Sequence, residues 1–340
     1  MTTRECFIGI DFGKTHVRFA VAEEQPDLKS FTKRRYQRDT PDGMLRQIFE
    51  GIDAALSETG YAREELKGIG MAVPAVVDRG TGVIAWGPDW DFLPGTSLTK
   101  PIAERYGVPV VADVDTVMAT WGEHWAGLGQ NCDRFVLLAW GTGLGTGVVL
   151  DGQVQEFPDN LFPEFGHSRV SDDDWSCNCG ATGCVDAMVG GPGIARHGRL
   201  AVERGEPTLL HALCGNDPEC LAAHMVFDAA DRGDAVATAI LERVAVLLGR
   251  LCSNAVLTFQ PQKIVIAGGL AKRSPRLLET INRTMREGCW LLFKGLSDCE
   301  VICSHLGDRA GVLGAIRKAR QVAIPGLTHG SGEAAMHARH

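Results

Sequence analysis

Three features that would place a protein in other classes are missing from this sequence: a surplus of basic residues, a secretion signal and an uninterrupted apolar run. The 34 lysines and arginines are outnumbered by 42 aspartates and glutamates, and a net charge of −8 argues against a nucleic-acid surface. The chain enters an apolar segment at Cys6 without the architecture of a signal peptide. The longest apolar run, residues 235–257, contains Glu242, Arg243 and Arg250, so it favours a core helix over a membrane span. We expect a cytoplasmic protein with no nucleic-acid partner and no membrane partner.

Length and composition are those of a globular protein with more than one core. A chain of 340 residues exceeds what one hydrophobic core usually serves, so two lobes are expected. Hydrophobic residues make up 45% and charged residues 22%, which is ordinary for globular proteins. Eleven cysteines could form a secreted disulfide scaffold, but they are spread over a large chain without a signal sequence. Reduced thiols therefore fit better.

A strand, a turn of small residues and a second strand occur once in each half of the chain. The first turn spans Asp11 to Thr15 and the second spans Gly141 to Gly147, each between apolar segments. One such unit alone is most often a plain hairpin, whereas two suggest duplicated lobes whose turns face one another. Glycine and threonine turns let backbone amides approach phosphate oxygens, and Asp11 is placed to hold magnesium. The phosphate-binding residues that we expect are Asp11, Gly13, Lys14, Thr15, Gly141, Thr142, Gly143 and Gly145.

Neither turn matches a Walker or a Rossmann pattern. A third glycine site, Gly268 and Gly269, ends a buried strand and precedes a helix, which by itself is a generic junction. Helices lie between the strands, because the apolar residues from Met44 to Leu56 recur at helical spacing and predict a stripe that faces the core. Strands and helices repeated in both halves predict an α/β protein of two lobes.

The most specific feature of the sequence is a histidine followed by three closely spaced cysteines. Their types and spacing are those of the soft or borderline ligands of a closed zinc site. Three cysteines this close could also arise by chance or form a local disulfide. Gly180 and Gly183 favour zinc over both alternatives, because they allow tight turns in which amides point at thiolates. The four metal ligands that we expect are His167, Cys177, Cys179 and Cys184.

Two acids, Glu164 and Asp186, flank the expected metal ligands. They supply more hydrogen-bonding groups than a purely structural knuckle needs, so we expect the metal to hold a polar binding site in shape. A zinc hydrolase is disfavoured, because four protein ligands leave no open position for a catalytic water.

Together these motifs resemble the ROK family of repressors, open reading frames and kinases, which has the actin, Hsp70 and sugar-kinase fold. The matching motifs extend from Asp11 to Gly314, nearly the whole chain. By this resemblance, residues 267–269 form the adenosine segment, which makes Gly268 and Gly269 ATP-binding residues. The implied fold is a two-lobed α/β actin-like ATPase, of the ribonuclease H-like kind, with an inserted zinc-binding motif.

The resemblance also implies a domain organisation. Repressors of the family carry a DNA-reading helix-turn-helix ahead of this fold, whereas here the first phosphate-loop strand begins within a few residues of Met1, which favours the kinase branch. We expect a small lobe over residues 1–117, on which a terminal helix at about 309–322 packs, and a large lobe over residues 118–308. Residues 324–340 lack periodicity and are expected to form a disordered tail.

The resemblance places the catalytic base at Asp115. The family's base is the aspartate of an Asn-Asp-Ala-Asn segment that opens a helix, and residues 114–117 are the equivalent here. A sugar hydroxyl must lose its proton as the bond to phosphorus forms, and a carboxylate at the end of a strand can accept that proton. The alternative is that Asp113 or Asp115 merely caps the helix that follows.

Several positions depart from the family pattern. Val114 and Val117 replace the two asparagines, and Asp186 replaces a glutamate. Lys14 stands where a second glycine is usual, which would cost about 1 kcal/mol if that position had positive φ. Extra acids such as Asp89 could pair with the ammonium group of an aminosugar, or they could be ordinary surface acids. The sugar-binding residues that we expect are Glu164, His167, Asp186, Asp89 and Val114.

The resulting hypothesis is an ATP-dependent phosphotransferase that acts on the 6-hydroxyl of a hexose or of an aminohexose such as glucosamine or kanosamine. Its ligands would be the sugar and Mg-ATP, with a structural zinc, and the habit of the family implies a homodimer. An alternative is a catalytically silent sugar sensor of the same fold. The retention of Asp11 and Asp115 counts against a sensor, which has no need of a base.

Overall fold

The computed structural model describes residues 4–38, 40–87, 90–157, 160–215, 217–273, 275–289 and 298–324. The chain divides into two compact units. Unit 1 comprises residues 1–133, 149–162 and 308–340, and unit 2 comprises residues 134–148 and 163–307. The expected boundary at residue 117 falls inside helix α3 (Asp115–Ala126), which belongs to unit 1. The expected tail from residue 325 onward lies outside the described residues.

Unit 1 is built on a mixed five-stranded sheet in the order β3-β2-β1-β4-β7. Strand β1 pairs antiparallel with β2, which pairs antiparallel with β3, whereas β4 and β7 run parallel to β1. The parallel strands therefore end at the same edge of the sheet. The strands are β1 (Cys6–Phe12), β2 (His16–Ala22), β3 (Leu28–Arg35), β4 (Leu66–Val73) and β7 (Val110–Val114).

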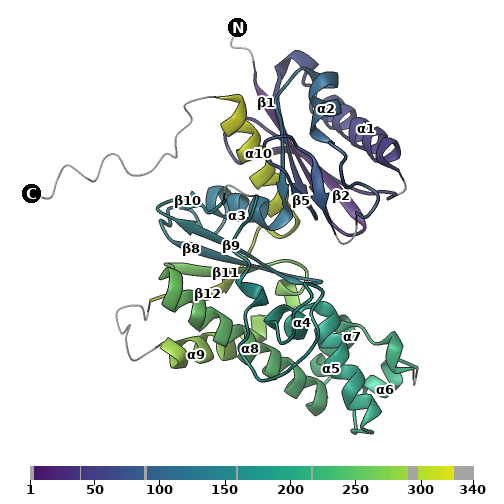
Figure 1. The fold of residues 1–340 in the computed structure, drawn as a ribbon, viewed down its shortest axis with the longest axis vertical. Coiled ribbons are helices and arrows are strands. Elements are labelled where there is room, and N and C mark those ends of the chain that lie inside the picture. The colour runs from purple at the N-terminus through teal and green to yellow at the C-terminus, as the bar shows by residue number, and fades with distance from the viewer. Residues whose placement is uncertain are drawn as a thin grey trace, which may run out of the picture. The chain divides into compact units, whose positions relative to one another are not determined.

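One face of this sheet carries helices α1 (Pro41–Thr59) and α2 (Thr99–Tyr106), as Figure 1 shows. Helix α1 begins where the Thr40 hydroxyl accepts the Gly43 amide, and it ends at Gly60 in the left-handed conformation. The predicted stripe is confirmed, because Met44, Ile48 and Ile52 are buried against alternate residues of β1. Each such side chain contributes about 1.5–3 kcal/mol by its burial.

The opposite face of the sheet carries helix α10 (Ala310–Ala323), which packs on β1, β4 and α3. Phe7 of β1 lies in a cluster with Val312 and Ile316 of this helix. The approach is close because β4 presents Gly70, where a Cβ would lie 1.9 Å from the Ala315 carbonyl oxygen. Shorter elements of unit 1 are β5 (Val76–Val77), β6 (Ile84–Trp86) and β10 (Gln153–Val154).

Unit 2 contains strands β8 (Phe135–Trp140), β11 (Lys263–Ala267) and β12 (Glu300–Cys303), with β11 parallel to both of its neighbours. Strand β9 (Leu144–Leu150) lies beside β8 and leaves unit 2 at Val148. The first four residues of β8 are fully buried, as expected for a strand that is covered on both faces. The chain is thus α/β in both units, as the sequence predicts.

The helices of unit 2 are arranged around one long helix, α8 (Ala235–Phe259), which contacts α4, α5, α7 and α9 (Figure 1). The apolar run 235–257 is therefore the predicted core helix. Among the described residues, no helix is both long and apolar enough to cross a membrane. The remaining helices are α4 (Val185–Val189), α5 (Gly191–Glu203), α6 (Leu210–Leu213), α7 (Ala223–Asp231) and α9 (Leu278–Cys289).

Candidate functional site

The predicted site residues fall into two groups, one in each unit. In unit 1, the sheet register brings Asp11 and Asp113 to the same level, because Asp11 pairs with Ala72 of β4 and Ala72 pairs with Asp113 of β7. Asp115 follows β7 directly. Three acids are therefore gathered at the carboxyl edge of the parallel strands, where ligands bind in α/β sheets.

Asp11 is partly buried among charged groups. The Arg18 guanidinium donates to its carboxylate at 3.2 Å, and a Cβ on Gly311 would lie 2.7 Å from its Cγ. Burial raises the pKa of Asp11 to about 7, although Arg18 lowers it, and Asp115 and Asp308 raise it further. A divalent cation beside this carboxyl would favour its ionised form.

The first turn is open to solvent at its tip. Lys14 and Thr15 are exposed, and the Gly13 amide donates to the His16 carbonyl at 2.9 Å. Lys14 is absent from the residues of positive φ, so the strain considered for a lysine at this position does not arise. The Tyr36 hydroxyl donates to the Gly13 carbonyl at 2.9 Å and fixes the base of the turn.

Asp115 is the first residue of helix α3, and it is half-buried. Its Oδ1 accepts the amide of Thr116 at 2.7 Å. The N-cap residue is Val114, whose side chain makes no capping hydrogen bond. Asp115 thus accepts one first-turn amide of α3, although neither Asp113 nor Asp115 is the N-cap residue.

An ion pair that the sequence did not indicate lies behind Asp115. Arg79 donates to both oxygens of Asp113, at 2.7 and 3.2 Å, and the exposed fraction of Asp113 is 1%. Asp113 also accepts the Val114 amide at 2.8 Å. Burial raises the pKa of Asp113, whereas the Arg79 guanidinium lowers it. Glu156 belongs to the same charged group, because its Oε2 lies 3.9 Å from Nε of Arg79 and accepts from the Lys318 ammonium.

The second glycine turn, in unit 2, is shorter than expected. Strand β9 begins at Leu144, and the turn is closed by the Gly141 amide, which donates to the Gly143 carbonyl at 2.9 Å. Gly145 therefore lies inside β9, and the expectation of a turn that continues to Gly147 is wrong. The reason is that Leu144 is buried and resumes the sheet after three residues.

A cavity of about 570 Å³ in unit 2 joins the second turn to the third glycine site. Gly141 and Thr142 line it together with Gly269. Gly268 must be glycine, since its φ is +103° and a Cβ would lie 2.4 Å from the Trp140 carbonyl oxygen. The other lining residues come from helices α5 and α7 and their flanks, and they include Gly191, Arg199 and His224. No motif marked these helical residues in the sequence.

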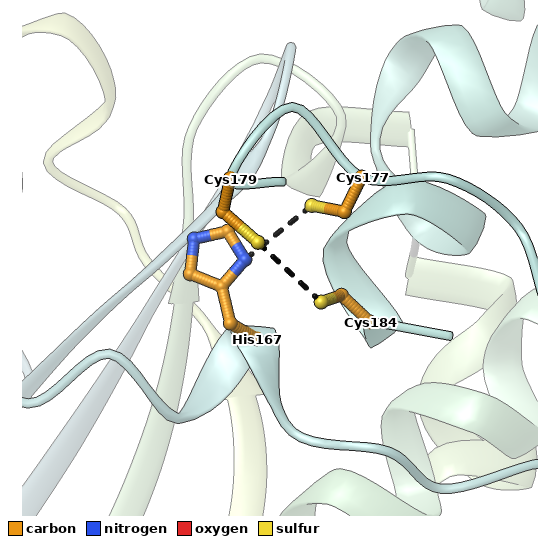
Figure 2. A group of neighbouring side chains, drawn as sticks. All are labelled: His167, Cys177, Cys179 and Cys184. Carbon is orange, nitrogen blue, oxygen red and sulfur yellow. Dashed lines mark hydrogen bonds between the residues drawn. The ribbon is translucent and has the colours of Figure 1, made fainter. Parts of the chain in front are cut away.

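The four expected metal ligands lie together in unit 2 (Figure 2). Their ligand atoms are all within 4.8 Å of one another. The Cys179 and Cys184 sulfurs are 3.7 Å apart, and the Cys177 sulfur is 3.5 Å from Nδ1 of His167. Tetrahedral zinc with Zn–S bonds of about 2.3 Å requires sulfur separations of about 3.8 Å, so the cluster fits this ion.

The two flanking acids contact different parts of this motif. Glu164 Oε2 is 3.1 Å from Nε2 of His167, the nitrogen that faces away from the cysteines. Asp186, at the start of α4, accepts the Leu144 amide at 2.6 Å, and its Oδ1 would lie 2.7 Å from a Cβ on Gly143. The zinc-type motif and the second glycine turn are therefore joined by Asp186.

Of the remaining predicted sugar-binding residues, Val114 is buried and Asp89 lies outside the described residues. Two groups around Asp11 were missed as site residues: Arg18, and Asp308, which is 3.4 Å from Arg18. The alternation of side chains along strand β2 could have indicated that Arg18 lies on the same face as the turn. Asp308 is distant in the sequence, so no local pattern could have indicated it.

Comparison with known proteins gives one family over nearly the whole chain. A profile described as the ROK family matches residues 7–322. The glucokinase of Thermotoga maritima is 31% identical over 91% of this chain and 95% of its own length. The glucokinase of Halalkalibacterium halodurans is 30% identical over 91% of this chain and 93% of its own length.

A solved structure shares the fold as well. The ROK family glucokinase from Streptomyces griseus, determined in complex with glucose and AMPPNP, superposes with a TM-score of 0.76 at 26% identity. The match covers 93% of this chain and 99% of that chain. The similarity therefore includes the residues of both groups described above.

Proposed function

Because the chain belongs to the ROK family, we propose that it transfers the terminal phosphoryl group of ATP to the 6-hydroxyl of a hexose or an aminohexose. The observation that carries this proposal is the pair of acids, Asp11 and Asp115, at one sheet edge of a chain that is similar to glucokinases over nearly its whole length.

Asp115 is the proposed general base. The sugar hydroxyl oxygen forms a bond to the terminal phosphorus as the bond from phosphorus to the ADP oxygen breaks, and Asp115 accepts the hydroxyl proton. A half-buried carboxylate at the start of a helix suits this task, since it is accessible to a substrate. Removal of such a base lowers the rate by about 10²–10⁴-fold in comparable enzymes.

Asp11 with the first glycine turn, in unit 1, and the second glycine turn, in unit 2, are each proposed to contact ATP phosphates. Magnesium prefers carboxylate and phosphate oxygens, and Asp11 offers a carboxylate beside the Arg18 cation. The ion, when bound with ATP, neutralises charge on the terminal phosphates. Amides of the second turn and the cavity that Gly269 lines would hold the rest of the nucleotide.

The proposed sugar site contains Glu164 and His167, with Asp186 contributing its second carboxylate oxygen. Asp186 uses one oxygen for the Leu144 amide. Because its side chain is one methylene shorter than that of a glutamate, it reaches less far toward a sugar hydroxyl. Asp89 and Val114 remain predicted sugar-binding residues, and an aminosugar remains a candidate substrate.

We propose that zinc has a structural role and takes no direct part in the reaction. His167, Cys177, Cys179 and Cys184 would bind it with all four of its positions, and Glu164 would orient the imidazole from its other nitrogen. A homodimer remains a prediction from family habit, which sedimentation can test.

The test is a coupled ADP-release assay with Mg-ATP and a panel of glucose, mannose, glucosamine, N-acetylated hexosamines and 3-amino-3-deoxyglucose. We expect turnover that depends on one or a few of these sugars. Sugar binding without turnover on any of them would favour the alternative, a catalytically silent sensor. The absence of both sugar binding and turnover, for every sugar of the panel, would overturn both functions.

A further inference from the structure

A second concave surface of unit 2 is lined by arginines and takes no part in the proposed reaction. It is a cavity of about 670 Å³ between helices α8 and α9 and the segment that follows His167. Arg169, Arg250 and Arg283 line it, and Glu287 is the single acid among its described lining residues. Asp174 pairs with Arg169, so a local charge of about +1 remains on a chain whose net charge is −8.

Two of these arginines are held in place by the protein, and the third has no partner among the residues that the structure describes. Arg250 donates to the Val170 carbonyl at 3.0 Å, and Arg169 donates to Asp174 at 2.9 Å. Each keeps further N–H groups for a ligand. In the described part of the chain, Arg283 makes no ion pair and no hydrogen bond.

We propose that this arginine groove binds the phosphate group of a small metabolite. Guanidinium groups match phosphate oxygens with paired N–H donors, and three of them meet around one cavity here. Asn254 and Thr284 add an amide and a hydroxyl to the lining, and the volume suits a ligand of the size of a sugar phosphate.

The position of Arg169 makes part of the groove rigid. Arg169 is two residues after His167, and a Cβ on Gly183 would lie 2.9 Å from its guanidinium carbon. The guanidinium is therefore packed against the backbone of the metal motif before any ligand binds. A preorganised donor loses less entropy on binding than a free surface side chain.

The test is isothermal titration of the full chain with inorganic phosphate and, separately, with glucose 6-phosphate. The groove variant carries Arg250→Gln and Arg283→Gln, and the matched control carries Arg232→Gln and Arg286→Gln. All four side chains are exposed, so both variants should fold, and neither control residue lines the groove. Glucose 6-phosphate bound at the proposed catalytic site would be unaffected in either variant.

We expect a binding event that the groove variant weakens at least about tenfold and that the control variant leaves unchanged. Tighter binding of glucose 6-phosphate assigns the groove to a phosphate ester, and tighter binding of inorganic phosphate assigns it to the free ion. Equal affinities of wild type and groove variant for both probes, or no binding at millimolar concentration, would overturn the proposal. The outcome does not depend on whether the chain phosphorylates a sugar.

Discussion

At the scale of single residues, the unexpected feature is how the charge of Asp113 is accommodated. Its carboxylate is almost completely buried and accepts hydrogen bonds from Nε and Nη2 of Arg79. Asp113 stands two residues before Asp115, so this ion pair fixes the backbone that carries the proposed base. Arg79 is thus a candidate positioning residue and not a catalytic one.

Replacement of Arg79 by methionine should leave a buried carboxylate without its partner. We expect the free energy of unfolding to fall by about 3–5 kcal/mol, because an uncompensated buried charge is costly. Adding Asp113→Asn to this variant should recover much of the loss, since it removes the charge. Urea unfolding of the two single variants and the double variant measures this coupling, and additive losses would show that the pair does not act as a unit.

At the scale of elements, the metal motif connects three segments of unit 2. Helix α4 starts directly after Cys184, and its Asp186 bonds to the amide at the start of β9. The cysteine loop is tight because Gly180 and Gly183 adopt positive φ, which other residues rarely do. Loss of the metal should therefore disturb the second glycine turn as well as the cysteine loop.

We expect one zinc ion per chain in protein purified without chelator, and its loss on Cys179→Ser. Cys220→Ser is the matched control, because Cys220 is also exposed and lies outside the cluster. Elemental analysis measures the zinc content, and thermal unfolding should show a lower Tm for Cys179→Ser alone, because bound metal stabilises the folded state. Zinc content that is the same in both variants would refute the assignment of Cys179 as a ligand.

At the scale of the whole molecule, one half-buried histidine should make stability depend on pH. Burial lowers the pKa of His197 to about 4, and Arg243 and Arg196 lower it too, whereas Asp173 and the Met188 backbone raise it. In the unfolded chain the group titrates near 6.5, so between these values the unfolded state binds more protons. The contribution of His197 to stability is therefore most favourable above pH 6.5 and falls as the pH drops toward 4, whereas the raised pKa of Asp11 acts in the opposite direction.

This effect is at most about 3 kcal/mol by linkage. His197→Gln should flatten the dependence of the unfolding free energy on pH between 6.5 and 4, even if its absolute stability is lower because the stacking of the ring on Trp175 is lost. Urea unfolding at pH 7 and at pH 5 measures the difference. Equal slopes for wild type and variant would show that His197 is not the group responsible.

Local patterns in the sequence predicted the elements that depend on local chemistry. The stripe from Met44 to Leu56, the core helix at 235–257 and the first strand-turn-strand unit all follow from side-chain periodicity and turn residues. The cysteine cluster was equally visible, because its ligands are close in the sequence.

What the sequence did not indicate depends on segments that meet only in the folded chain. Arg79 and Asp113 are 34 residues apart, and Arg18 meets Asp308 from the other end of the chain. The extent of the second turn was misjudged because glycines inside a strand look like glycines in a loop, and only the burial of Leu144 separates them. The return of residues 149–162 to unit 1 likewise has no local signal.

In the proposed reaction, Asp115 removes the proton of a sugar hydroxyl as ATP phosphorylates it. The most direct test compares wild type with Asp115→Asn by following formation of the sugar phosphate with ³¹P NMR, using the best sugar of the panel, while sugar binding is measured by calorimetry. We expect turnover to fall by about 10²–10⁴-fold while the sugar still binds within a few-fold of the wild-type affinity. Turnover that survives the substitution within a few-fold of wild type would contradict the proposed role of Asp115.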